Sequence, residues 1–318
     1  MPAAPTGPLP EGGLAVTTVD LKNVSRWYGN VVAVNDISMT LEAGVTGLLG
    51  PNGAGKTTVL HMMAGFLAPS KGTVTVDGTP TWRNPSVYRT LGLVAEREAV
   101  HGFLTAREFV LASAKMQKLS DPAAATEWAL NMVEMAPAAD RRIETYSKGM
   151  RQRTRVAAAL VHEPQVLLLD EPFNGMDPRQ RMHMMALLHE LGDRGHTILF
   201  SSHILEEVEQ VSGTVQVIVA GRLAASGDYR KIRRLMTNRP HVFAVQSSDD
   251  RRLAVALIGE KSVTGVEIEA NGMTVRAGDY GSFTRALPRI ALDSGIRLRK
   301  LIPSDESLES VFSYLLEA

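Results

Sequence analysis

The chain has 318 residues, and its 34 Lys and Arg residues balance its 34 Asp and Glu residues, so the formal net charge is zero. That balance disfavours a protein whose main task is to neutralise a phosphate backbone, and we expect no nucleic-acid partner. The lack of cysteine excludes disulfides, thiol catalysis and cysteine-ligated metal centres. Apolar runs are only a few residues long, far short of the roughly 20 residues that a membrane-spanning helix needs.

The first part of the chain combines a tail with a series of short strands. Residues 1–14 are rich in Pro and Gly and lack the basic start and apolar core of a secretion signal, so we expect a flexible tail. From about residue 15, β-branched runs separated by glycine turns predict strands, among them Val16–Val19, Val31–Val34 and Thr73–Val76.

A phosphate-binding pattern lies within this region. Residues 50–57 read GPNGAGKT and fit G-x-x-x-x-G-K-[ST], between an apolar strand, Val45–Leu49, and a predicted helix, Thr57–Phe66. Glycines let backbone N–H groups point at phosphates, and the helix N-terminus adds partial positive charge. We expect Lys56 to bridge the β- and γ-phosphates and Thr57 to ligate Mg²⁺. The expected nucleotide-binding residues here are Gly50, Pro51, Asn52, Gly53, Ala54, Gly55, Lys56, Thr57 and Thr58.

The middle of the chain changes to helical character and then returns to strands. Residues 105–161 are rich in Ala, Leu, Met and Glu, and Asp121-Pro122 predicts a helix cap followed by a first helical residue. Strands are predicted at Val166–Leu169 and Thr197–Ser201, with a helix over Arg179–Leu191 between them. This alternation indicates a parallel α/β sheet.

Two carboxylates, Asp170 and Glu171, directly follow the buried strand Val166–Leu169. Ligand sites of open α/β sheets lie at this end of the strands. Asp170 suits Mg²⁺ coordination, and Glu171 suits the general base that activates the attacking water.

A further segment identifies a family. Residues 146–153 read YSKGMRQR and head a predicted helix. They resemble the LSGGQ signature of ATP-binding cassette (ABC) ATPases, in a form common among exporter subunits. Other matches follow in the family's order, and the resemblance covers about residues 16 to 226. It implies an α/β phosphate-loop ATPase domain with antiparallel β and helical subdomains, over residues 15–228.

The resemblance also implies roles for individual residues. Tyr28 would stack on adenine, and Ser147 and Gly149 would contact the γ-phosphate. Asp177 falls in a match to the D-loop, in the nucleotide-binding set. His203 matches the switch histidine, which contacts the γ-phosphate. The expected catalytic residues are Lys56, Glu171 and His203.

Three positions depart from the family's pattern. Lys148 replaces the first glycine of the signature, and Met150 replaces its glutamine. Glu96 stands where the family usually has glutamine, as is frequent in the exporter subunits that this chain resembles. A carboxylate can still ligate Mg²⁺ or its water, so the expected metal-binding residues are Thr57, Asp170 and Glu96.

The sequence has one phosphate loop and one signature, whereas the family's active unit uses two of each. The resemblance therefore implies a head-to-tail dimer, with a second copy or a paralogous subunit. Each ATP would lie between the phosphate loop of one subunit and Ser147–Gly149 of the other. A separate integral-membrane permease would dock at about residues 99–144, which places the chain in the cytoplasm, peripheral on the cytoplasmic face of the membrane.

The C-terminal part predicts a second domain, residues 241–318, after a linker at residues 229–240. Its expected order of strand, helix, two strands, helix, strand and helix is close to a ferredoxin-like α+β module. The segment Asp305–Leu315 is similar to the D-x-S-L-E-x-V-F-x-x-L tail of exporter ATPases. The resemblance thus implies an ATPase that drives export.

Two alternatives stay open at this point. An importer ATPase with a C-terminal ligand-sensing domain would usually carry glutamine at position 96 and would bind a ligand at residues 240–318. A soluble cassette that acts on ribosomes or DNA, without transport, would need paired cassettes, long coiled-coil insertions or strong basic character. The transported substrate is chosen by the permease and cannot be read from this chain.

Overall fold

The computed structural model describes residues 17–97, 100–236 and 239–316. The predicted flexible tail, residues 1–14, and the start of the first predicted strand lie outside the described residues. The chain divides into two compact units, Met1–Ala224 and Ala225–Ala318. Among the described residues, no helix combines the length and the apolar character needed to cross a membrane.

The first unit is built on a six-stranded sheet in the order β10-β9-β3-β8-β7-β6. Its strands are β3 (Gly44–Leu49), β6 (Leu91–Val94), β7 (Val166–Asp170), β8 (Thr197–Ser201), β9 (Thr214–Val219) and β10 (Arg222–Asp228). The pairs from β9 through β6 are all parallel. The predicted parallel α/β sheet is therefore confirmed, and the carboxyl ends of β3, β7 and β8 lie at one edge.

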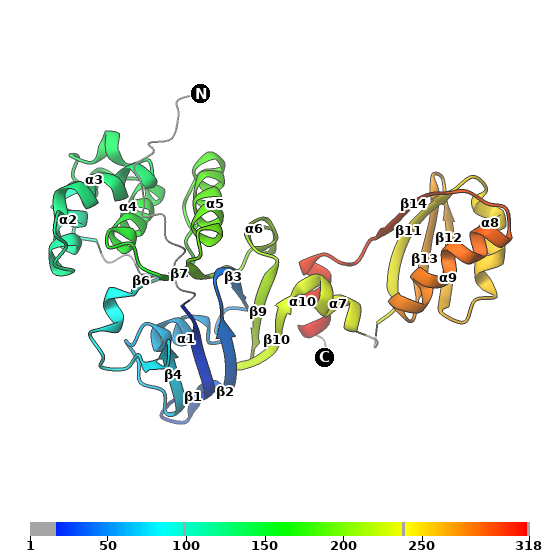
Figure 1. Ribbon diagram of the computed structural model, residues 1–318, viewed down its shortest axis with the longest axis horizontal. Helices are drawn as coiled ribbons and strands as arrows, with labels where there is room; N and C mark the ends of the chain where they lie inside the picture. Colours follow the sequence, from blue (N-terminus) through cyan, green and yellow to red (C-terminus); the bar gives the residue numbers. More distant parts are fainter. Residues whose placement is uncertain (1–16, 98–99, 237–238, 317–318) are drawn as a thin grey trace. The chain divides into compact units, whose positions relative to one another are not determined.

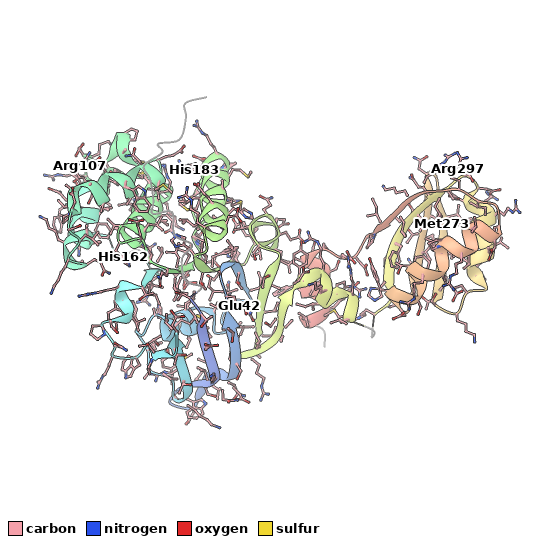
Figure 2. All side chains as sticks on the ribbon, viewed as in Figure 1. Glu42, Arg107, His162, His183, Met273 and Arg297 are labelled. Carbon is pink, nitrogen blue, oxygen red and sulfur yellow. The ribbon has the colours of Figure 1, made fainter. Side chains whose placement is uncertain are left out.

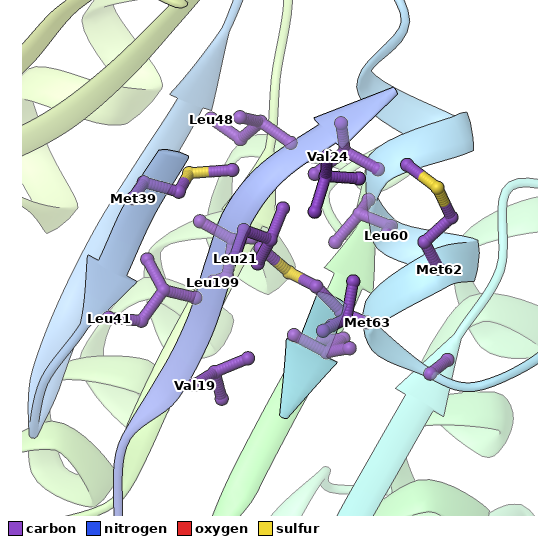
Figure 3. Packing of buried hydrophobic residues seen from close by; sticks show 14 of the residues in the cluster. Val19, Leu21, Val24, Met39, Leu41, Leu48, Leu60, Met62, Met63 and Leu199 are labelled. Atoms are coloured by element: carbon purple, nitrogen blue, oxygen red, sulfur yellow. The ribbon is translucent and has the colours of Figure 1, made fainter. Parts of the chain in front are cut away.

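A second, antiparallel sheet has the order β2-β1-β4-β5. Its strands are β1 (Val19–Tyr28), β2 (Val31–Leu41), β4 (Lys71–Val76) and β5 (Thr79–Pro80). Helix α1 (Lys56–Met63) packs against it, and Figure 3 shows Leu21 of β1 near Leu60 and Met63 of this helix. Leu48 and Leu199 of the parallel sheet belong to the same buried cluster. The two sheets thus share one core around the helix that follows the phosphate loop.

Helices complete the first unit. They are α2 (Ala106–Met116), α3 (Pro122–Met132), α4 (Lys148–Leu160), α5 (Pro178–Asp193) and α6 (Leu205–Val211). Helices α2, α3 and α4 pack on one another, as Figure 1 shows. Asp121 caps α3 and Pro122 is its first residue, as predicted. Together these elements confirm the predicted α/β architecture, with antiparallel β and helical parts beside the parallel sheet.

The second unit contains an antiparallel four-stranded sheet in the order β12-β13-β11-β14. Its elements are α7 (Tyr229–Leu235), β11 (His241–Ser247), α8 (Asp250–Ile258), β12 (Val263–Glu269), β13 (Gly272–Ala277), α9 (Tyr280–Asp293), β14 (Leu298–Pro303) and α10 (Leu308–Leu316). Strand and helix side chains, with Phe243 and Phe283 among them, form its own buried cluster. Pro288 lies inside α9, and the helix continues past it.

The C-terminal segment that begins at Asp305 packs on α7. Asp305 pairs with Arg233, whose side chain is fully buried, and Glu306 pairs with Arg234 at 2.7 Å. Leu308, at the start of α10, is completely buried. Helix α7 therefore occupies most of the segment predicted as a linker, residues 229–240. The predicted domain bounds, residues 15–228, 229–240 and 241–318, stay a prediction.

Candidate functional site

The phosphate loop connects β3 to α1 and ends at Gly55. This glycine has a φ of 106°, and a Cβ atom on it would lie 2.6 Å from the carbonyl oxygen of Ala33. This left-handed φ is strained for any residue other than glycine, and the Ala33 carbonyl oxygen leaves no room for a Cβ atom. Glycine at this position therefore lets the loop curl tightly against β2 before the helix begins.

Lys56 is the first residue of α1, and its side chain points into the loop. Its Nζ donates hydrogen bonds to the carbonyl oxygens of Gly50, at 2.7 Å, and Pro51, at 3.2 Å. Burial lowers the pKa of Lys56, while the carboxylates of Glu171 and Asp170 act in the opposite direction. The ammonium group of Lys56 is buried, so water would only weakly screen its attraction to a bound phosphate.

A cavity of about 340 Å³ opens beside the loop. Residues from four separate parts of the first unit line it: Ala33, Asn52, Gly53, Gly55, Lys56, Thr57, Thr58, Glu96, Asp170 and Glu171. The fold thus brings together the phosphate loop, the two predicted carboxylates at the end of β7 and the predicted carboxylate after β6.

Two of the predicted metal ligands, Thr57 and Asp170, contact each other in the cavity. Thr57 Oγ1 donates to Asp170 Oδ2 at 2.7 Å, and Asp170 is almost fully buried. Among the described residues, no group of three His, Asp or Glu side chains is arranged to hold a metal by itself. A hydroxyl and a carboxylate beside a phosphate site fit Mg²⁺, which prefers oxygen ligands, binds few protein groups and takes further ligands from phosphates and water.

Glu171 follows β7 with an unusual backbone. Its φ is 51°, in the left-handed region that residues other than glycine rarely adopt. Its Oε2 lies 2.9 Å from Nδ1 of His203, so two of the predicted catalytic residues are in direct contact. Burial raises the pKa of Glu171, and the hydrogen bond from His203 partly offsets this. A raised pKa makes a carboxylate a stronger base.

This shift predicts the acidic limb of the pH profile. Because burial raises the pKa of Glu171 above the ordinary value of 4.5, the base should take up its proton at a higher pH than an exposed glutamate. We expect kcat/KM for MgATP, which reports groups of the free enzyme, to fall as the pH is lowered, with a midpoint above 4.5. The residual activity of Glu171→Gln should lack this limb, and a limb that survives in that variant would assign it to another group.

Two contacts of Glu171 were not predicted from the sequence. Ser201 Oγ accepts a hydrogen bond from the Glu171 N–H at 2.9 Å, and Gln152 Nε2 donates to the Glu171 carbonyl oxygen at 3.4 Å. Ser201 is the last residue of the predicted strand Thr197–Ser201 and lies two residues before His203. Its place at a predicted strand end is the sequence signal that could have pointed to it.

Several predicted nucleotide contacts are not among the residues that line this cavity. Tyr28, at the end of β1, is 44% exposed and stacks on the guanidinium of Arg26 at 4.8 Å. Ser147 caps α4 by accepting a hydrogen bond from the N–H of Met150, and Asp177 caps α5. Within the described residues, the structure therefore places Ser147 and Asp177 at helix starts outside the phosphate-loop cavity.

Gly149 and Lys148 lie against the D-loop segment. A Cβ atom on Gly149 would lie 2.9 Å from the carbonyl oxygen of Gly175, and one on Gly175 would lie 2.6 Å from the Lys148 side chain. The signature and the D-loop segment around Gly175 thus pack closely. The Lys148 side chain, which replaces the usual glycine of the signature, lies against Gly175.

Glu96 lines the cavity but is exposed. We expect Glu96→Gln to lower basal hydrolysis by less than about threefold, because Asp170 and Thr57 remain as predicted oxygen ligands. ATPase assays of the purified chain across a range of Mg²⁺ concentrations would measure this. A loss as large as that caused by Glu171→Gln would show that Glu96 is an essential ligand.

Comparison with known proteins gives the family. The ABC transporter model matches residues 34–174, which contain the phosphate loop and the signature. The chain is 31% identical to the bacitracin transport ATP-binding protein BcrA of Bacillus licheniformis, over 94% of this chain and 97% of that protein. The chain belongs to the ABC transporter ATP-binding proteins. It is thus an ABC transporter ATPase, as its resemblance to this family implies.

Other ABC transporter proteins match the first unit more than the second. The chain is 37% identical to the Nod factor export ATP-binding protein I of Rhizobium leguminosarum bv. viciae, over 69% of this chain and 71% of that protein. A solved structure of an ATP-binding subunit of an ABC transporter is 27% identical, with a TM-score of 0.63 over 68% of this chain and 92% of that one. A dimeric bacterial ABC transporter cassette, 22% identical with a TM-score of 0.61 over 65% of this chain and 97% of that one, supports the same fold.

Proposed function

We propose that this ABC ATPase drives export through a separate membrane permease. One observation carries the proposal: the similarity to the bacitracin transport protein continues over 94% of the chain and so reaches into the second unit. The linearmycin resistance protein LnrL of Bacillus subtilis, 35% identical over 65% of this chain and 68% of that protein, supports the same assignment. These relatives are named for three different compounds, so the proposal assigns export and no particular compound.

For the chemical step we propose the roles that the cavity suggests. Lys56 and the loop N–H groups bind the phosphates of ATP, and Tyr28 stacks on adenine. Glu171 accepts the proton of the attacking water, and His203 orients the Glu171 carboxylate through Nδ1. Bound Mg²⁺ would neutralise phosphate charge, and Thr57 and Asp170 would hold it, with Glu96 beside them.

The working unit we propose is a head-to-tail dimer. Ser147 and Gly149 do not line the cavity that holds Lys56, among the residues that the structure describes. Ser147 is exposed at the start of α4, where a second subunit could receive it. A signature supplied by the partner would complete each site. ATP binding would then close the dimer, and hydrolysis would open it again.

The permease contact we propose is a cavity of about 420 Å³ between α2 and β6. Its wall is largely apolar, and two of its side chains, Phe66 and Met116, are 58% and 77% exposed. His162, labelled in Figure 2, lines it as well. Part of the cavity wall, including Met116, comes from the predicted docking segment, residues 99–144, whose first residue falls outside the described residues. An apolar segment of an integral-membrane protein fits this wall, and such a contact would hold the chain at the cytoplasmic face of the membrane.

For the second unit we propose the ferredoxin-like fold. The element order from β11 to β14 is βαββαβ, every strand pair is antiparallel, and the first and third strands are the central ones. These features support the proposal. The tail motif that resembles exporter ATPases supports export as the direction of transport. Two of its residues are buried: Asp305, which pairs with Arg233 of α7, and Leu308 at the start of α10.

Purification from detergent-solubilised membranes tests the export proposal. The wild-type chain should retain an integral-membrane permease, and the reconstituted pair should carry substrate out of the compartment that holds ATP. Met116→Glu should lose the permease because a charge enters the apolar cavity, with ATP hydrolysis by the isolated chain kept. Met182→Glu, at a residue 60% exposed on α5, is the matched control. Equal retention in both variants would contradict the cavity assignment, and uptake driven by ATP would contradict export.

A further inference from the structure

A buried serine bonds to both acidic residues of the predicted hydrolysis centre, to the side chain of Asp170 and to the backbone of Glu171. Ser201 is the last residue of β8, and the parallel register places it opposite Asp170, the last residue of β7. Its side chain is fully buried. Its Oγ donates to Asp170 Oδ1 at 2.5 Å and accepts from the Glu171 N–H at 2.9 Å. One hydroxyl therefore bonds to two consecutive residues that have different predicted roles.

The first of these bonds determines which oxygen of Asp170 faces the cavity. A serine hydroxyl has a single donor hydrogen, and here Asp170 Oδ1 receives it. The other oxygen, Oδ2, accepts from Thr57. Because Asp170 is only 2% exposed, water has little access to replace the serine. Loss of the hydroxyl would leave Oδ1 without its buried partner and free the carboxylate to rotate away from Thr57.

The second bond holds the backbone of Glu171. The φ of 51° at this residue is unfavourable for a side chain with a Cβ atom, and such conformations persist when surrounding contacts determine them. The Ser201 hydroxyl accepts from the N–H of this same residue. The turn that results brings the Glu171 carboxylate to within 2.9 Å of His203 Nδ1.

The neighbouring serine shows that this contact is specific to position 201. Ser202 is also fully buried, but its hydroxyl donates to Glu207 Oε2 on α6 at 2.7 Å. Successive residues at a strand end point in opposite directions. Of these two serines, Ser201 is the one that bonds to the Asp170 carboxylate and to the Glu171 N–H.

We infer that Ser201 is a positioning residue for ATP hydrolysis, which fixes the Mg²⁺-facing oxygen of Asp170 and the backbone turn of Glu171. This inference rests on the proposed hydrolytic roles of those two residues. It assigns a function to a side chain that would touch neither the nucleotide nor the metal. A packing role alone would affect the stability of the fold and leave metal binding unchanged.

Metal binding in the absence of turnover separates these possibilities. The probe is Mn²⁺, measured by electron paramagnetic resonance with the full chain and a non-hydrolysable ATP analogue. Ser201→Ala should weaken Mn²⁺ binding by about tenfold and lower kcat for ATP by about tenfold or more, because a charge-assisted hydrogen bond is lost. Ser201→Thr keeps the hydroxyl and should recover most of both quantities.

Ser212→Ala is the matched control. Ser212 is 5% exposed, and its hydroxyl lies within hydrogen-bond distance of the carbonyl oxygens of Val45 and Thr214, outside the cavity. This control should lower the melting temperature and leave Mn²⁺ affinity and kcat close to wild type. If Ser201→Ala behaves like the control, the inference is wrong. If Ser201→Thr folds but performs no better than alanine, the hydroxyl is not the active feature. If the threonine variant does not fold, the alanine variant alone decides.

Failure of the Ser201 inference can be told apart from failure of the proposed export function. Wild-type hydrolysis and export test that function, whereas the Mn²⁺ affinity of Ser201→Ala relative to wild type tests the serine. A wild-type chain that fails to export but shows the affinity difference would retain the Ser201 assignment.

Discussion

Glu171→Gln should keep ATP binding and lose nearly all turnover. The amide cannot accept the proton of the attacking water, and general-base catalysis typically contributes about 100- to 10,000-fold to a rate. Steady-state hydrolysis should therefore fall at least about 100-fold, with nucleotide affinity within a few-fold of wild type. In the presence of ATP and Mg²⁺ the variant should elute from a sizing column as a dimer, because closure is no longer reversed by hydrolysis.

Glu42→Gln is the matched control for this experiment. Glu42, labelled in Figure 2, is exposed and does not line the phosphate-loop cavity. The same chemical change at this position should leave turnover and elution volume unaltered. A Glu171→Gln variant that turns over within tenfold of wild type would show that another group accepts the proton.

Glu171→Gln should also raise the melting temperature of the chain at neutral pH in the absence of nucleotide. Burial raises the pKa of Glu171 in the folded chain, so the fold favours the neutral carboxyl. The stabilising contribution is then largest at low pH and is lost as the pH rises through the folded pKa. At neutral pH the wild-type chain carries a buried charge that glutamine lacks. Thermal unfolding of both proteins measures the difference, and a lower melting temperature for Glu171→Gln would contradict the direction of the shift.

Much of the fold and of the cavity could be predicted because the signals are local. The phosphate loop is one continuous segment between a strand and a helix, and Asp170 and Glu171 directly follow a strand that is apolar throughout. Parallel strands bring their carboxyl ends to one edge, so these separate segments meet without further information. The structure accordingly gathers Lys56, Thr57 and both carboxylates around one cavity.

The contacts that were missed depend on pairing between distant segments. Ser201 meets Asp170 only through the register of β7 with β8, and the strand pattern does not state that register. Arg233 and Asp305 are separated by 72 residues, and neither the basic segment around Arg233 nor the motif that begins at Asp305 indicates that the two side chains pair. The side-chain partner of a polar residue is decided by tertiary packing, which periodicity and motifs do not encode.

Subunits damaged in different halves of the site should complement one another. Lys56→Ala removes the charge that we propose binds the β- and γ-phosphates, so its own phosphate loop should fail to bind and hydrolyse ATP. Ser147→Arg would place a bulky cation at the γ-phosphate position of the partner's site and block closure. We expect each homodimer to lose hydrolysis by at least about 100-fold. Ser147→Ala, which removes the α4 cap without adding a cation, separates the cap loss, about 1 kcal/mol, from the block.

A mixed dimer of the two inactive variants contains one doubly damaged site and one intact site. The intact site pairs the phosphate loop of the Ser147→Arg chain with the signature of the Lys56→Ala chain. If each site turns over independently, mixing should restore up to about half of the wild-type rate per mixed dimer, since one of its two sites is complete. If each chain completed its own site, mixing would restore nothing. Mixed dimers that form but stay inactive in steady state would next be tested by single-turnover hydrolysis. A single turnover there would keep the head-to-tail arrangement and reject independent turnover, and its absence would reject the arrangement itself.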